Sequence, residues 1–191
     1  MTQTTTERLC SFEEYLTCDD GTDSRYELVD GKLERMNPPT FRHLLISDFI
    51  QDNFKAQINR LSLHWLCFRE AGVRTGWRKS RLPDVYVVTA EQVMEFLDES
   101  TVCQSAPMLV VEVVSPDSVK RDYRYKRSEY AALEIPEYWI VDPIESKITI
   151  LLLEDGLYEE KEFSGSQQIV SATFPEIALT VEQVLAAGNV G

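Results

Sequence analysis

The order of apolar and polar positions divides the N-terminal part of the chain into a short helix and a hairpin. Ser11-Phe12-Glu13-Glu14 is typical of a capped helix start, and the pattern predicts a short helix that runs toward Leu16. Strand-forming residues then occupy 25–29 and 32–36, and Asp30-Gly31 stands between them. Because this dipeptide favours tight turns with positive φ, the two runs are predicted to pair as an antiparallel hairpin.

Further along, helical and strand-like spacings alternate. Apolar residues recur every third or fourth position over 41–61, which predicts a long core helix, and further helices are expected over 90–97, 117–133 and 180–187. Strands are expected over 64–70, 82–89, 107–115 and 138–141, followed by a hairpin of 147–153 with 157–163; the Gly- and Arg-rich stretch 72–81 is expected to be a connection.

This alternation predicts an α/β fold with a mixed central β-sheet flanked by helices, preceded by an N-terminal hairpin and the long helix. With 191 residues and 43% hydrophobic content, the chain is expected to form a single domain, 1–191, whose core covers about 11–185. No internal repeat or linker interrupts the pattern. The fold is therefore expected to contain one continuous core.

Composition limits the cellular setting. The polar N-terminus lacks an export signal, and the longest apolar runs are much shorter than the roughly 20 residues that cross a bilayer. The four cysteines are widely spaced and form no CxxC pair. We therefore expect a cytoplasmic protein with reduced thiols and no membrane partner.

Charge bears on which partners the protein can have. The formal net charge is −13, from 32 acidic and 19 basic residues, which argues against tight non-specific binding of nucleic acid. Two local basic strips remain, and for most of their members a solvated surface position is at least as good an interpretation. Their members are Arg69, Arg74, Arg78, Lys79 and Arg81 in the first strip, and Lys120, Arg121, Arg124, Lys126 and Arg127 in the second.

Two acids lie inside runs of strand-forming residues. Asp84 follows Leu82-Pro83 and precedes 85–88, and Glu112 interrupts the apolar run 109–114. Because a buried carboxylate needs a cation or hydrogen-bond donors, the pair suggests a shared Mg²⁺ site, to which the backbone carbonyl of Val113 could add an oxygen. The alternative is an Asp that caps a turn and a Glu paired with a core Arg.

Lys126 lies on or beside the apolar face of the helix expected over 117–133. Tyr123, Tyr130 and Leu133 mark that face, and an ammonium group there needs an anionic partner. A lysine that extends to solvent is the alternative. The position of Lys126, one short loop after the strand of Glu112, favours the first interpretation.

Several ordered motifs resemble the Uma-type family of proposed restriction endonucleases, whose fold is that of the PD-(D/E)xK nucleases, the restriction-endonuclease-like fold. The resemblance extends from about Ser11 to Leu185. The motifs are Tyr26-Glu27-Leu28-Val29-Asp30-Gly31, Pro83-Asp84-Val85, Val111-Glu112-Val113-Val114-Ser115-Pro116, Lys126 with Tyr130, and Glu137-Tyr138-Trp139-Ile140-Val141-Asp142-Pro143.

The resemblance implies roles for individual residues. Asp84 and Glu112 match the motif acids that ligate the metal, and Glu27 matches an early acid that would complete the site through a second ion or a metal-bound water. The motif lysine is missing, because position 114 is a valine. The resemblance instead places the lysine on the following helix, as Lys126, with the nearer Lys120 as the alternative.

The implied activity is that of a Mg²⁺-dependent endonuclease, with Mn²⁺ as a substitute metal, that hydrolyses nucleic-acid phosphodiester bonds by a metal-activated water. We also expect a homo-oligomer, in particular a homodimer, in which the partner would supply basic surface. Two alternatives are a catalytically silent interaction module on the same fold and a phosphodiesterase that acts on RNA or nucleotides. His43 is interpreted as a capping or surface residue, and Tyr123 and Tyr130 as pocket-lining residues without a catalytic role.

Overall fold

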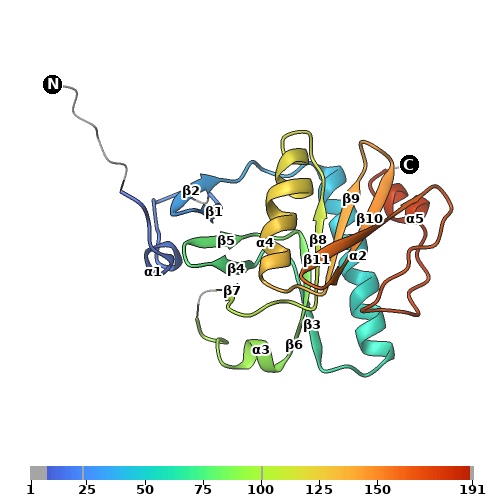
Figure 1. Cartoon of the computed structure of the whole chain (residues 1–191), viewed down its shortest axis with the longest axis horizontal. Helices are drawn as coiled ribbons and strands as arrows, with labels where there is room; N and C mark the ends of the chain where they lie inside the picture. The colour runs from blue at the N-terminus through green and yellow to red at the C-terminus, as the bar shows by residue number, and fades with distance from the viewer. Residues whose placement is uncertain (1–7, 23, 100, 190–191) are drawn as a thin grey trace.

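The strands of the protein form two sheets in a computed structural model that describes residues 8–22, 24–99 and 101–189 (Figure 1). In spatial order, the larger sheet contains β11 (Leu157–Ser164), β10 (Lys147–Glu154), β9 (Glu137–Asp142), β8 (Leu109–Val113), β6 (Val85–Thr89) and β3 (Trp65–Phe68). The smaller sheet contains β2 (Lys32–Arg35), β1 (Tyr26–Val29), β5 (Lys79–Arg81), β4 (Gly72–Gly76) and β7 (Val102–Cys103).

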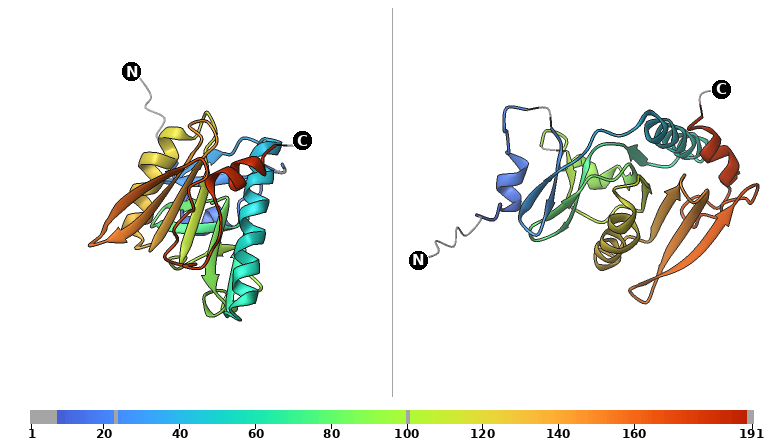
Figure 2. Two further views of the ribbon diagram at one scale, coloured as in Figure 1. Left: turned by 90° about the vertical axis from the view of Figure 1, so that its right-hand side faces the viewer. Right: turned by 90° about the horizontal axis from the view of Figure 1, so that it is seen from above.

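Helices lie on both faces of the larger sheet. In the two views of Figure 2, α2 (Phe41–Arg60) and α4 (Arg127–Ala132) lie on opposite sides of it. Strand β8 shows why, because Val111 packs into the core cluster that contains α2, whereas Val110 packs into the cluster that contains Tyr130 of α4. Successive strand residues point to opposite faces, so β8, which is buried at every position, must be covered on both faces.

The core beneath α2 is built on residues spaced four apart. Ile46, Ile50, Phe54 and Ile58 are all buried. The Phe54 ring lies 5.2 Å from the Trp139 ring in an edge-to-face contact. The spacing predicted for a helix over 41–61 is confirmed, and its apolar side is the side that meets the sheet.

The N-terminal predictions are also confirmed. Helix α1 (Phe12–Leu16) begins with a full capping box, in which the Glu14 N–H donates to Ser11 Oγ at 3.1 Å and the Ser11 N–H donates to the Glu14 carboxylate at 2.8 Å. Strands β1 and β2 pair antiparallel. Asp30 and Gly31 between them have φ of 49° and 80°, so both residues of the turn adopt the left-handed conformation.

The stretch 72–81 was expected to be a connection, and this prediction is wrong. It forms β4 and β5, which pair with each other, and β5 joins β1 through the register of Ser80 with Leu28. The charged residues misled the prediction. Arg81 is only 2% exposed because carboxylates neutralise it, so this basic residue belongs to the interior.

Several element boundaries also differ from the prediction, and three of these differences change how a segment is described. Asp84 precedes β6 and is not part of it, and the helix expected over 90–97 is limited to α3 (Glu91–Met94). The helix expected over 117–133 consists of a π-helical segment η1 (Arg121–Lys126) followed by α4. A π-helix places its hydrogen bonds one residue further apart than an α-helix and occurs frequently at functional sites.

Two further elements complete the description. The closing helix expected over 180–187 is confirmed as α5 (Val181–Ala186), which begins with a capping box of Thr180 and Gln183. Among the residues that the structure describes, no helix has both the length and the apolar character needed to cross a membrane.

We expect Phe54→Ala to lower the free energy of unfolding by about 3–5 kcal/mol, because it removes a fully buried ring between Trp139 and Phe174 and leaves a cavity. Urea unfolding followed by circular dichroism measures this loss. Phe41→Ala on the same helix is the matched control, because the Phe41 side chain is exposed. Equal losses in the two variants would contradict this description of the core.

Candidate functional site

A cleft of about 640 Å³ opens where the loops after β2 and β8 meet the start of α2 and the segment η1. Asp84, Glu112, Val113 and Lys126 all line it. These residues come from the loop before β6, from β8 and from η1. The strands β6 and β8 are neighbours in the larger sheet, and η1 begins the crossover from β8 to its parallel neighbour β9. This topology brings together residues that are far apart in sequence.

Asp84 is held at both carboxylate oxygens. Its Oδ1 lies 2.8 Å from Nε2 of His43, which belongs to the first turn of α2, and its Oδ2 accepts the backbone N–H of Val113 at 2.6 Å. The side chain remains 21% exposed toward the cleft. Asp84 is therefore fixed in orientation and still accessible.

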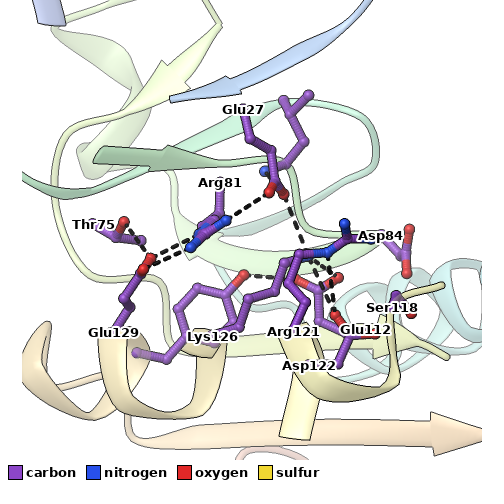
Figure 3. Close-up of polar contacts among 12 residues, drawn as sticks. Glu27, Thr75, Arg81, Asp84, Glu112, Ser118, Arg121, Asp122, Lys126 and Glu129 are labelled. Atoms are coloured by element: carbon purple, nitrogen blue, oxygen red, sulfur yellow. Dashed lines mark hydrogen bonds and ion pairs between the residues drawn. The ribbon is translucent and has the colours of Figure 1, made fainter. Parts of the chain in front are cut away.

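Glu112 is held in the same way, but in a more buried position. Its Oε2 accepts from Nζ of Lys126 at 2.6 Å, and its Oε1 accepts from the hydroxyl of Tyr130 at 2.6 Å (Figure 3). The side chain of Glu112 is 3% exposed. A carboxylate in such surroundings is oriented by charge-assisted hydrogen bonds.

The ammonium group of Lys126 is shared by three carboxylates. Besides Glu112, Nζ lies 3.4 Å from Oε1 of Glu27 and 3.7 Å from Oδ1 of Asp122. We refer to Lys126 with Glu27, Glu112 and Asp122 as the Lys126 cluster. The lysine side chain is 2% exposed, so the alternative in which it extends to solvent is wrong.

A second buried ion pair supports the Lys126 cluster from the smaller sheet. Arg81 donates from Nη1 to Glu27 at 2.8 Å. It also donates two hydrogen bonds to the carboxylate of Glu129 of α4, from Nε at 2.7 Å and from Nη2 at 2.6 Å. Glu27 also accepts the backbone N–H of Leu82 at 3.2 Å. Glu27 is fully buried, so it does not point outward from the hairpin, although it lies between Tyr26 and Leu28 on a hairpin strand.

The electrostatics of the Lys126 cluster reflect an excess of negative charge. Burial raises the pKa of Glu112 to about 8; Lys126 opposes the rise, and the nearby Asp84 and Asp122 add to it. Burial alone would lower the pKa of Lys126, but Glu112, Glu27 and Asp122 together raise it. For Glu27, Lys126 and Arg81 outweigh burial and lower the pKa. Glu112 and Lys126 therefore retain protons that isolated side chains would release, whereas Glu27 releases its proton more readily.

The donor set fits a hard divalent cation. Within residues 8–22, 24–99 and 101–189, no three His, Cys, Asp or Glu side chains already form a ready-made metal site. Asp84 and Glu112 nevertheless present two carboxylates to one cleft, and Oδ1 of the buried Asp122 has no hydrogen-bond partner among the described residues. Mg²⁺ is commonly bound by one or two carboxylates, with water and substrate phosphate in the other positions. The residues present are compatible with such a site.

The structure brings Glu27, Glu112 and Lys126 together, with Asp84 at the edge of the Lys126 cluster. Lys120, the alternative lysine, is exposed and lies 5.3 Å from the Tyr125 ring, outside the cluster. Asp122 was missed, although its position four residues before Lys126 on a helix was an available signal. His43 and Tyr130 were assigned no role at Asp84 or Glu112, and no local pattern indicates those contacts.

Comparisons with known proteins agree with this architecture. The family model described as "Uma2: Putative restriction endonuclease" matches residues 12–182. The crystal structure of a "putative nuclease belonging to DUF820" from Anabaena variabilis ATCC 29413 is similar with a TM-score of 0.78 and 17% identity, over 94% of this chain and 99% of that chain. The type IIG restriction endonuclease BpuSI gives a TM-score of 0.41 and 10% identity, over 80% of this chain and 17% of that chain. The search of curated proteins found no match. The expected restriction-endonuclease-like fold, a mixed sheet flanked by helices, is confirmed.

The metal-free protein should lose stability as the pH rises between 4.5, the ordinary pKa of a glutamic acid, and about 8, the pKa of Glu112 in the fold. In this window the unfolded chain has released a proton that folded Glu112 retains, so linkage makes the free energy of unfolding fall with rising pH and level off above the window. Urea unfolding in EDTA at several pH values measures the slope. Glu112→Gln should make the slope shallower, and identical slopes would contradict the assignment.

Proposed function

Since this chain belongs to the Uma2 family, as the motifs in its sequence had indicated, we propose that it is a Mg²⁺-dependent endonuclease that hydrolyses phosphodiester bonds of nucleic acids. A nuclease-type family suggests a nucleic-acid substrate and, as in restriction-endonuclease-like proteins generally, a divalent metal ion. The observation that carries the proposal is that Asp84, Glu112 and Lys126 line one cleft, with two carboxylates beside one buried ammonium group. Such a set suits transfer of a phosphoryl group to water.

Asp84 and Glu112 would hold the cation, and the carbonyl of Val113 would add a backbone oxygen. When bound, the cation supplies Lewis-acid activation of the attacking water and neutralises charge that develops at the phosphate. Two contacts prepare these ligands in advance, because His43 orients Asp84 and Tyr130 orients Glu112. Ligands that are already oriented need little reorganisation when substrate and cation bind.

Lys126 would act on the reacting phosphate. Its raised pKa keeps the ammonium group charged at neutral pH, and because Lys126 lines the cleft, that charge would lie close to a phosphate bound beside the cation. It would stabilise charge on the phosphate oxygens or orient the attacking water. Glu27 would keep the lysine in place, because it contacts both Lys126 and Arg81.

We expect Glu112→Gln to lower metal-dependent cleavage by about 100-fold or more, because the amide cannot supply the anionic oxygen that a hard cation requires. Cleavage of plasmid DNA and of RNA, with Mg²⁺, Mn²⁺ or EDTA, measures the effect. Glu159→Gln, at an exposed position of β11, is the matched control. If the wild-type protein cleaves neither substrate and binds neither metal, the proposal fails and a silent interaction module is favoured.

Lys126→Met should reduce cleavage by about 100- to 1,000-fold, whereas Lys120→Met should change it little, because only Lys126 contacts the metal-binding acid. Both rates are compared at a temperature at which circular dichroism shows each variant to be folded. A larger loss in Lys120→Met would place the catalytic lysine in the loop and refute the assignment to the helix.

A further inference from the structure

The cleft gathers basic side chains in a protein whose net charge is −13. Four arginines line it together with Lys126, and they come from different elements: the ends of the hairpin strands β1 and β2, the connection from β3 to β4, and η1. They are Arg25, Arg35, Arg69 and Arg121. An acidic protein that binds a polyanion needs local cations of this kind.

Two of the arginines are already neutralised. Arg25 pairs with Glu70 at 2.7 Å, and Arg69 pairs with Asp48 of α2. Each of these guanidinium groups therefore has a carboxylate partner before any ligand arrives, although Nε of Arg69 is buried without an acceptor among the described residues. Their contribution to attracting an anion is correspondingly reduced.

The guanidinium groups of the other two arginines form no hydrogen bond to a carboxylate among the described residues. Arg35 is exposed, and within residues 8–22, 24–99 and 101–189 its side chain forms neither an ion pair nor a hydrogen bond. Arg121 has one carboxylate nearby, that of Asp122, at 3.9 Å from Nε, which is beyond hydrogen-bond distance. This Nε is buried and has no acceptor among the described residues. Buried donors without acceptors are rare, so the guanidinium group of Arg121 has incomplete partners in the free protein.

We propose that Arg35 and Arg121 bind phosphate groups of a polynucleotide next to the phosphate at the catalytic centre. Guanidinium groups match phosphate oxygens in bidentate fashion, and these two arginines reach the cleft from different elements, the hairpin and η1. The inference rests on the proposed function and narrows it, because only a strand with several phosphates can fill these positions as well as the catalytic centre. A mononucleotide lacks the flanking groups.

Two phosphate contacts predict how steeply binding should weaken as the salt concentration rises. Each neutralised phosphate of a duplex contributes about 0.9 to the slope of log affinity against log salt concentration. Two contacts therefore give a slope of about −2, which is shallow compared with that of strongly basic DNA-binding proteins. A shallow slope also agrees with the acidic balance of the chain.

The test is equilibrium binding of a short labelled duplex to the full chain in EDTA, where cleavage is blocked, over a series of KCl concentrations. Arg35→Gln and Arg121→Gln should each weaken duplex binding, and the loss should not depend on the nucleotide sequence of the duplex. Each variant should also reduce the slope of log affinity against log salt concentration by about 1. Arg60→Gln is the matched control, because Arg60 pairs with Glu176 and does not line the cleft. A nucleoside monophosphate should fail to displace the duplex.

Unchanged slopes in both arginine variants, or full displacement by the monophosphate, would overturn the inference. Because Arg35 is exposed, its variant provides a result even if Arg121→Gln does not fold. The proposed function is judged separately by cleavage with Mg²⁺. Binding that depends on Arg35 without any cleavage by the wild-type protein would reject the proposed catalysis, whereas cleavage with unaltered binding in both variants would reject only the phosphate contacts.

Discussion

The burial of a single ammonium group, that of Lys126, constrains the arrangement of both sheets. Its carboxylate partners come from β1 of the smaller sheet, from β8 of the larger sheet and from its own helical segment. A charge taken out of water is tolerated only when it is paired, so the two sheets must approach each other at this position. The cleft forms where they meet. The contacts of Lys126 that join the sheets therefore also place Glu112, Asp122 and the lysine itself along a cleft that a ligand can reach.

Arg81 is a second buried cation with carboxylate partners from different elements, and it does not line the cleft. It connects β5 with Glu27 on the neighbouring strand and with Glu129 on α4, so the smaller sheet is tied to the crossover helix through charge as well as through packing. Replacing such a network with apolar residues could preserve stability, but it would not orient polar groups. The ionic interior is therefore better explained by the orientation it imposes on Glu112 and Lys126 than by stability.

The sequence indicated which charged side chains lie together at the cleft better than it indicated the surroundings that hold them. Asp84, Glu112 and Lys126 were found because each is a charge within an apolar pattern, and a charge in that setting requires a partner. The partners of Arg81 lie 54 and 48 residues away, so no local pattern could show that this arginine is internal or that its neighbours form strands. The contact of His43 with Asp84 depends on where α2 begins over the sheet, which is a tertiary property.

The apolar residue at position 114 has a consequence for how this architecture can vary. A lysine two residues after Glu112 on the same strand would be fixed to it by the pleat, whereas here Val114 is 2% exposed and packs with Tyr130 and Tyr138. Here the lysine belongs to a π-helical segment, so the position of its ammonium group does not depend on the register of the strand. Because a π-helical turn can gain or lose its extra residue as a unit, the length of this segment determines whether the lysine faces the acids. An insertion or deletion of one residue in this segment would therefore turn Lys126 away from the acids and leave the sheet intact.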